Sequence, residues 1–247
     1  MSAWSSSSNI GDCLTHLHFL MKLGGEHSMW VKPEYIGQIS EIAHGSNVTI
    51  HNVWERPENT TDFWRANGML EHKGVYYRND NDICGWLMDW FNHLGRHCGH
   101  PCPVYPDRQS MLWDSEVILN ANVREVEYDV LIINSPPTSG QCPEYDHGEL
   151  YELGLQLRQN GLYVVFAQWE GSTPYTLCEL GKLSLGAKLI IESANGPCFL
   201  THSVWNTAKD RITLLSPMYL DYGESGRHRH AANVAEATEH CQTLGYL

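Results

Sequence analysis

The residues best placed to do chemistry near the N-terminus come just before an apolar helical pattern. The sequence Asn9-Ile10-Gly11-Asp12 runs directly into the stretch 13–23, which ends at Gly24-Gly25. Gly11 lets a ligand or another part of the chain approach the backbone closely, and we expect Asp12 at the N-cap or in the first turn of the helix. An aspartate there either caps the helix or, in a desolvated cleft that raises its pKa, acts as a general base.

Two polar loops in the second half of the chain follow apolar, β-branched runs at 129–134 and 187–192. Ligands of open parallel sheets bind outside the carboxyl ends of the strands, so both loops are candidate binding sites. Hydroxyls, and backbone amides at a helix start, can hold a diphosphate, although each loop taken singly is equally well explained as an ordinary connection. The candidate ligand-binding residues are Ser135, Thr138 and Ser139 in the first loop and Ser193, Asn195, Gly196, Pro197 and Cys198 in the second.

The elements that must position these residues alternate along the chain between strand and helix. In the second half we expect strands at 129–134, 162–167, 187–192 and 211–215, and helices at 145–159, 173–185 and 198–206. In the first half we expect helices at 13–23, 33–43, 83–94 and 111–119, and strands at 27–31 and 48–53. This alternation predicts an α/β chain with two Rossmann-like domains, each built on a parallel sheet.

The domain boundary is expected in a plausible linker at 120–127. The first Rossmann-like domain then covers 1–122 and the second covers 123–225. The remaining residues, 226–247, alternate alanine with polar residues and are expected to form a C-terminal helix that packs back toward the N-terminal domain.

The stretch 9–25, NIGDCLTHLHFLMKLGG, resembles the opening of the heptosyltransferase-like (GT9-type) glycosyltransferases, which have the two-domain GT-B fold. In that family the aspartate of the Gly-Asp pair is the base that deprotonates the acceptor hydroxyl, and the matching residue is Asp12. The family holds a nucleotide sugar against its C-terminal domain, and the loops 135–139 and 193–198 match its two donor loops in position. The resemblance thus implies an acceptor domain followed by a nucleotide-sugar domain, with Asn9 and Gly11 beside the base.

The sequence departs from the family pattern at three places. Only Ala3-Trp4 precede the serines, so the first strand is expected to be short or poorly formed. The acidic residue of the sugar-binding turn is replaced by Asn195 or displaced to Glu192, and Arg158 is the one arginine or lysine between 135 and 168. These departures leave open a non-catalytic nucleotide- or glycan-binding protein that kept the fold and lost the chemistry.

The function implied by the resemblance is transfer of a hexosyl or heptosyl group from a nucleotide-diphosphate sugar to a hydroxyl of a glycan or a modified base. No cofactor is expected beyond the donor, because helix N-termini and neutral donors can stabilise the leaving diphosphate without a metal. The acidic pair Asp80 and Asp82 lies just before an expected helix. Capping is the favoured role there, so a metal-dependent transferase is the weaker hypothesis.

Two further clusters and three tryptophans are candidates for binding roles. His97, Cys98, His100 and Cys102 are potential metal ligands, but a structural zinc site usually needs two ligand pairs separated by a spacer, so we expect no zinc. The segment 228–230 is expected to be a solvated turn. Trp54, Trp64 and Trp169 follow expected strands, where an aromatic face can stack on a sugar or a base, and Trp169 is expected near the nucleobase of the donor.

Charge and composition restrict the partners of the chain. The 247 residues carry 29 Asp+Glu against 16 Lys+Arg, a formal net charge of −13, which disfavours sequence-independent binding of nucleic acid. A viral-type enzyme that glycosylates DNA bases stays an alternative and would need a local basic groove. No apolar run approaches the roughly 20 residues of a membrane span, and eight widely spaced cysteines suggest free thiols, so we expect a cytoplasmic protein.

Overall fold

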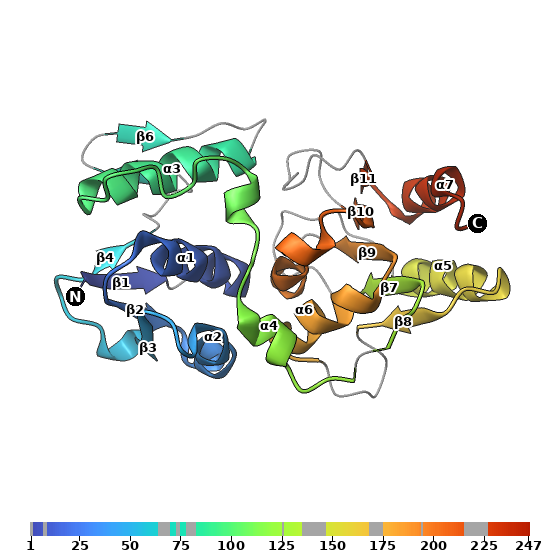
Figure 1. Cartoon of the computed structure of the whole chain (residues 1–247), viewed down its shortest axis with the longest axis horizontal. Coiled ribbons are helices and arrows are strands. Elements are labelled where there is room, and N and C mark those ends of the chain that lie inside the picture. The colour runs from blue at the N-terminus through green and yellow to red at the C-terminus, as the bar shows by residue number, and fades with distance from the viewer. Residues whose placement is uncertain are drawn as a thin grey trace. The chain divides into compact units, whose positions relative to one another are not determined.

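The computed structural model describes two compact units, Met1–Leu112 and Trp113–Leu247, shown in Figure 1. The boundary expected from the sequence lies at 122, and the short helix at 116–120 contacts the second unit's helix at 177–186. The described residues are 2–6, 9–63, 70–72, 75–77, 83–124, 126–134, 147–167, 175–193, 195–214 and 227–247; the side chains at 70–72, 75–77, 83–84 and 147 are not included.

The first unit contains a parallel sheet in the strand order β3-β2-β1-β4. Its strands are β1 Ser2–Ser6, β2 His27–Val31, β3 Val48–Asn52 and β4 Thr61–Asp62. The expectation of a poorly formed first strand was wrong, because β1 has five residues and pairs with both neighbours. Two serine hydroxyls of β1 form hydrogen bonds with histidines: Ser2 Oγ lies 2.6 Å from His27 Nδ1, and Ser6 Oγ lies 2.6 Å from His16 Nδ1.

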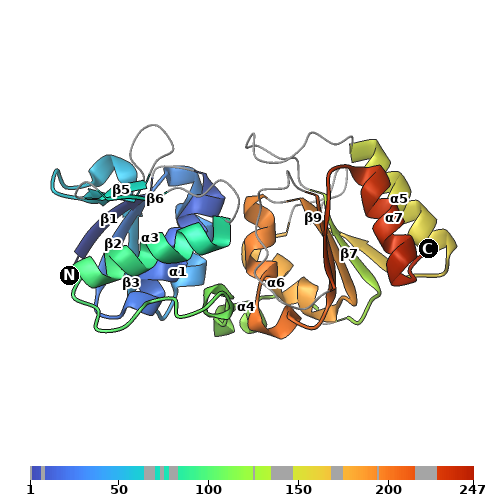
Figure 2. The ribbon, with the colours of Figure 1, turned by 90° about the horizontal axis from the view of Figure 1, so that it is seen from above.

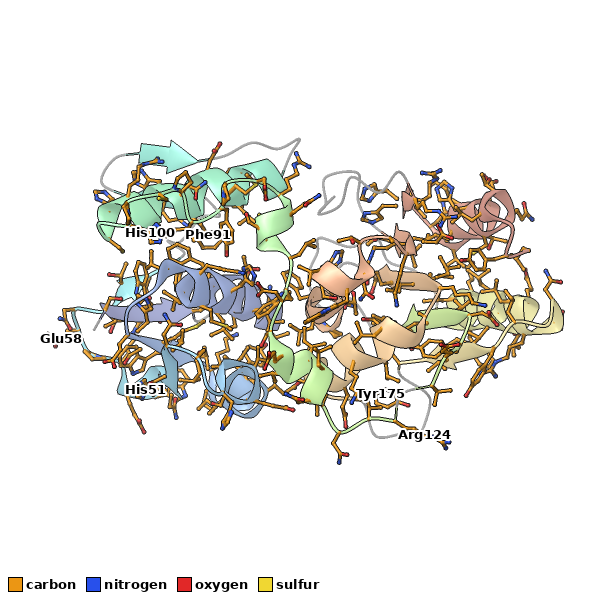
Figure 3. All side chains as sticks on the ribbon, viewed as in Figure 1. His51, Glu58, Phe91, His100, Arg124 and Tyr175 are labelled. Carbon is orange, nitrogen blue, oxygen red and sulfur yellow. The ribbon has the colours of Figure 1, made fainter. Side chains whose placement is uncertain are left out.

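The helices of the first unit are α1 Ile10–Leu23, α2 Ile36–Ala43, which follows the 3-10 turn η1 Pro33–Tyr35, and α3 Ile83–His97. Two short segments, β5 Leu70–His72 and β6 Val75–Tyr77, form an antiparallel pair. An aromatic cluster joins α1 to α3: Phe91, labelled in Figure 3, stacks on Phe19 of α1 with ring centroids 4.7 Å apart. Phe63, just after β4, stacks on Trp4 of β1 at 4.8 Å, so α1 is held between the sheet and α3.

The second unit contains a parallel sheet in the strand order β11-β10-β9-β7-β8. Its strands are β7 Val130–Ile133, β8 Val164–Phe166, β9 Leu189–Ser193, β10 Asp210–Leu214 and β11 His228–Ala231. Helix α5 (His147–Gln159) lies between β7 and β8, and α6 (Leu177–Gly186) lies between β8 and β9, so these connections are the βαβ units that the alternation predicts. The register places Glu192 of β9 beside Thr213 of β10, and Ile190 beside Arg211.

Helices cover both faces of the second sheet, as Figure 2 shows. Helices α5 His147–Gln159 and α7 Val234–Leu244 pack on one face, over an apolar core that includes Ile132, Ile191 and Ile212. On the other face, α6 Leu177–Gly186 packs over Leu131, Ile133 and Ile190. The C-terminal helix α7 contacts β10, β11 and α5 of its own unit. The α/β architecture with two parallel, Rossmann-like sheets is confirmed.

Three local expectations were wrong. The helix expected at 111–119 is instead the 3-10 turn η3 Gln109–Met111 and the short α4 Glu116–Asn120, and the helix expected at 198–206 is two 3-10 segments, η4 Gly196–Thr201 and η5 Val204–Asn206. The same long-range pairing interrupts both, because Trp113 N–H donates to His202 O and Val204 N–H donates to Trp113 O, each at 2.9 Å. The expected solvated turn at 228–230 is part of strand β11.

Among the residues that the structure describes, no helix is both long and apolar enough to cross a membrane. Within the same part of the chain the cysteines form no disulfide.

Candidate functional site

Asp12 lies in the first turn of α1, directly beyond the carboxyl end of β1. The N-cap of the helix is Asn9, whose side-chain oxygen accepts a hydrogen bond from Asp12 N–H at 3.1 Å. Asp12 therefore is not the cap itself, and the cap fixes the backbone that carries its carboxylate. Gly11 is buried and Asp12 is half-buried, so the first turn of α1 presents this side chain at the edge of the sheet.

Lys32 and Tyr35, which follow β2, lie in the electrostatic environment of Asp12. Burial, then the charges of Glu34, Cys13 and Asp12, raises the pKa of Tyr35. Burial also raises the pKa of Cys13 to about 11, with Asp12 adding to this shift and Lys32 opposing it. The Lys32 ammonium lies 5.8 Å from the centroid of the Tyr35 ring. A carboxylate, an ammonium and a phenol therefore gather at the carboxyl ends of two neighbouring parallel strands.

The next strand along the same edge, β3, leads into the 3-10 turn η2 Val53–Glu55. The turn carries Trp54, which is 79% exposed, as expected for an aromatic side chain available to stack on a ligand. Beyond it, Arg56 donates to Ser5 Oγ at 3.3 Å and pairs with Asp62 at 3.0 Å, which ties the segment after β3 to β1 and β4. Because β1 and β3 are separated by one strand, their ends lie about 10 Å apart.

In the second unit, the turn predicted to bind the donor follows β9 and is mostly self-bonded. The Asn195 amide donates to Ser193 Oγ at 2.6 Å, and Cys198 N–H donates to Asn195 O at 3.1 Å. Ser193, Asn195 and Cys198 are buried, while Gly196 and Pro197 are half-buried. The side chains of Ser193 and Asn195 thus shape the turn, and its partly accessible residues are Gly196 and Pro197.

A buried ionic cluster, which was not predicted from the sequence, lies directly beneath this turn. Arg211 Nη1 lies 2.5 Å and His202 Nε2 lies 2.9 Å from Glu192 Oε1, and Thr201 Oγ1 donates to Glu192 Oε2 at 2.9 Å. All four residues are less than 9% exposed. The register of β9 and β10, which the sequence does not give, places the glutamate near the arginine on one sheet face.

The cluster corrects one expectation about the sugar-binding turn. From the sequence, Glu192 was a candidate for the displaced acidic residue of the sugar-binding turn. Both of its carboxylate oxygens instead accept hydrogen bonds from protein groups in a fully buried position. Burial acts to raise the pKa of Glu192, but the nearby Arg211 and His202 more than offset this and hold the pKa well below its usual range. Glu192 is therefore an internal counter-ion.

One group of potential metal ligands is found among the described residues. It consists of Glu192, Cys198 and His202, whose ligand atoms all lie within 4.8 Å of one another. The Arg211 guanidinium contacts the Glu192 carboxylate, and its fixed charge opposes cation binding there. Within that same part of the chain, the expected candidates at 97–102 form no comparable group; Cys98 and Cys102 are exposed and His100 Nδ1 lies 2.6 Å from Cys102 O.

Several residues singled out in the sequence lie outside the described part of the structure. They are Ser135, Thr138, Ser139 and Trp169 among the donor-binding candidates, together with Trp64 and the acidic pair Asp80 and Asp82. The placement of the first donor loop thus stays a prediction.

Comparison with known proteins gives a likeness in structure alone. No family model matches the chain, and no curated protein matches it by sequence. Among solved structures, E. coli heptosyltransferase WaaC with ADP is similar at a TM-score of 0.63 and 10% identity, covering 98% of this chain and 96% of that one. WaaC with ADP-2-deoxy-2-fluoro heptose gives a TM-score of 0.59 and 11% identity, with 98% of each chain covered.

A glycosyl transferase of family 9 from Veillonella parvula is similar at a TM-score of 0.51 and 9% identity, covering 98% of this chain and 88% of that one. These similarities extend over nearly the whole chain and include both parallel sheets, at identities where sequence comparison finds no match. The chain therefore has the GT-B fold of the heptosyltransferases, in a highly divergent sequence.

Proposed function

We propose that this protein is a glycosyltransferase that moves a sugar from a nucleotide-diphosphate sugar to a hydroxyl acceptor without a metal ion, with Asp12 as the general base. The observation that carries the proposal is the position of Asp12, held by the Asn9 cap at the carboxyl end of β1. The fold likeness to WaaC over 98% of the chain supports the same reaction class.

The acceptor side of the reaction belongs to the first unit in this proposal. Asp12 takes the proton from the acceptor hydroxyl as that oxygen attacks the anomeric carbon, which passes through an oxocarbenium-like state. Trp54, exposed in the turn that follows β3, offers an aromatic face for the acceptor. Lys32 and Tyr35 add a cation and a hydrogen-bond donor near the base.

The donor side belongs to the second unit, where Ser135, Thr138, Ser139 and the turn 193–198 hold the diphosphate, with Trp169 against the nucleobase. η4 is a six-residue 3-10 segment, so it lacks the macrodipole of a long α-helix. Arg211, the buried cation nearest the turn, is already paired with Glu192. Individual backbone amides and hydroxyls therefore have to stabilise the leaving diphosphate, as electrostatic stabilisation without a metal requires.

The proposal is tested by the conservative variant Asp12→Asn. We expect turnover of the nucleotide sugar that the wild type uses to fall by about 100-fold to 10 000-fold, the range for loss of a general base, while donor affinity is retained. Glu26→Gln, which removes a charge from an exposed site on the same unit, just before the start of β2, is the matched control. Unchanged turnover in folded Asp12→Asn would remove this residue from the mechanism.

A non-catalytic nucleotide- or glycan-binding protein is the second candidate, favoured by the internal bonding of Ser193, Asn195 and Glu192. Calorimetry with ADP-, GDP-, UDP- and CDP-linked sugars, followed by product analysis of each mixture, separates the two candidates. ADP-heptose is tested first, because the WaaC structures contain ADP or an ADP-heptose analogue. Binding with no sugar transferred or released would support the non-catalytic candidate.

A further inference from the structure

The ionic cluster beneath η4 interrupts a sheet face that is otherwise apolar. Leu131, Ile133 and Ile190 form the buried hydrophobic surface of this face under α6. On the same face the chain instead places Glu192, which follows Ile190 on β9, and the β10 residues Arg211 and Thr213, which pair with Ile190 and Glu192; all three are buried. Replacing a buried ion pair with apolar residues of similar volume is often neutral or stabilising, so global stability alone does not explain why charged groups occupy this position.

Glu192 and Arg211 hold the end of η4 by contacts with the hydroxyl and the carbonyl of Thr201. The Thr201 hydroxyl donates to Glu192 Oε2 at 2.9 Å, and the Thr201 carbonyl accepts from Arg211 Nη2 at 2.8 Å. The same carbonyl accepts from Asn206 Nδ2 at 2.8 Å, and this amide also reaches Ser184 of α6 at 2.7 Å. The last residue of η4 is thereby fixed to β9, β10 and α6 together.

The two amino groups of Arg211 join Glu192 to Thr201. Nη1 pairs with the Glu192 carboxylate at 2.5 Å and also donates to Thr201 Oγ1 at 3.0 Å, while Nη2 donates to the Thr201 carbonyl at 2.8 Å. A planar guanidinium makes these contacts at once, whereas a lysine ammonium acts as a single point charge. The start of the turn has its own fixation, the Asn195 to Ser193 hydrogen bond, so the segment 195–201 is held at both ends.

We propose that Glu192 and Arg211 are positioning residues that, through Thr201, hold the turn 195–201 in the conformation that binds the donor diphosphate. The inference rests on the proposed function, and it assigns no contact with the donor to either side chain. The half-buried residues Gly196 and Pro197 lie between the two fixed ends. Loosening the Thr201 end therefore weakens donor binding by letting these residues, including the Gly196 backbone N–H, move.

The test uses the full-length protein and two variants that change the cluster differently. Arg211→Lys keeps a positive charge for Glu192 and loses the second contact to the Thr201 carbonyl. Thr201→Val keeps the side-chain shape and loses the hydroxyl, which contacts Glu192 Oε2, Arg211 Nη1 and Cys198 O. The matched control is Arg158→Lys in the same unit, because Arg158 also donates to a backbone carbonyl, that of Val164 at 2.9 Å, on the opposite face of the sheet.

Two measurements separate positioning from a general effect on folding. Amide hydrogen exchange without nucleotide is compared between the segment 195–202 and the reference helix α5, and calorimetry measures affinity for ADP, GDP, UDP and CDP. We expect both cluster variants to accelerate exchange in 195–202 selectively. We also expect them to weaken binding of the nucleoside diphosphate that the wild type prefers by about tenfold, the loss expected for one hydrogen bond involving a charged group. Arg158→Lys leaves both values near wild type.

Different results would contradict the positioning role and the proposed function. Unchanged exchange in 195–202, or an equal rise in 195–202 and α5, would overturn the positioning role. Selective acceleration with unchanged nucleotide affinity would overturn the link to donor binding. A wild type that binds none of the nucleoside diphosphates, while the exchange pattern changes as expected, contradicts the proposed function and with it the donor role of the turn.

Discussion

Asp12 acts, in the proposed mechanism, at a position set by another residue. Asn9 caps α1 through the Asp12 amide, so the backbone carrying the carboxylate depends on one side-chain hydrogen bond. The sequence showed a Gly-Asp pair at a helix start and placed Asp12 either at the N-cap or in the first turn, and the first turn is correct. The sequence did not show which residue is the cap, because Asn and Asp are both common N-cap residues.

Asn9→Ala tests whether the cap serves catalysis as well as folding. We expect a loss of about 1 kcal/mol in the free energy of unfolding, together with slower turnover because the first turn frays. Asn233→Ala is the control, since Asn233 caps α7 in the same way by accepting from Glu236 N–H at 2.9 Å. It should cost similar stability and leave turnover unchanged. Equal effects of both variants on turnover, measured with urea unfolding alongside, would contradict the positioning of Asp12 by its cap.

His202 gives the second unit an acid-sensitive stability. Burial, then the charge of Arg211, lowers the pKa of His202 to about 4. The unfolded chain, with the ordinary histidine pKa of 6.5, thus binds more protons than the folded chain in this window. Stability is lost as pH falls from 6.5 through 4, by at most about 3 kcal/mol for this group.

The variant His202→Gln isolates that contribution, because glutamine can donate to Glu192 without titrating. Urea unfolding from about pH 7 to about pH 4 should show a shallower decline for the variant than for the wild type. The groups around His202 are Glu192, Arg211 and His228, and all are retained in the variant. Parallel declines in the two proteins would show that His202 contributes nothing to the pH dependence.

At the scale of elements, local patterns predicted the regular strands and long helices well. β2 is found at its predicted bounds, and α1, α5 and β7 are within a few residues of theirs, because continuous apolar runs and glycine stops identify them. Failures occurred where distant backbone groups pair: the Trp113 contacts with His202 and Val204 break two expected helices. Strand β11, His-Arg-His-Ala, is short and polar, and pairs with β10 at the edge of the sheet, so it carries no apolar alternation to detect.

Close packing between α5 and β8 predicts an unusual response to Gly154→Ala. An added Cβ at Gly154 would lie 2.2 Å from Phe166 Cζ and 3.0 Å from Ile132 Cδ1. Overpacking should therefore destabilise the second unit by about 1–3 kcal/mol, although alanine has the higher helix propensity. Gly37→Ala in α2 is the control, because its Cβ meets no atom within 4 Å, and it should be neutral or stabilising by up to about 1 kcal/mol. Urea unfolding measures both variants; a stabilising Gly154→Ala would refute this packing.

At the scale of the whole molecule, the net charge of −13 leaves few cations to hold the donor diphosphate and disfavours nucleic acid as the acceptor. It predicts no appreciable binding of duplex DNA at about 0.15 M salt, which fluorescence anisotropy with a labelled duplex would check. Binding that weakens steeply with added salt would instead indicate a local basic groove and favour the alternative of a DNA-base glycosyltransferase.

Both halves of the chain were predicted as α/β units from strand and helix alternation, and the GT-B fold is found at identities near 10%. The buried cluster of Glu192, His202 and Arg211 was not predicted, because its members come from three elements that only the fold brings together. Sequence patterns thus located the turn that follows β9, while the groups that hold it became visible only in three dimensions.

The central claim, sugar transfer from a nucleotide donor, is tested most directly by mass spectrometry of wild-type protein incubated with a panel of nucleotide-diphosphate sugars and without added metal. We predict that the protein transfers the sugar of at least one donor to an acceptor or to water and releases the nucleoside diphosphate. Adding a chelator should not change the rate. No nucleoside diphosphate released from any donor that the protein binds would contradict it.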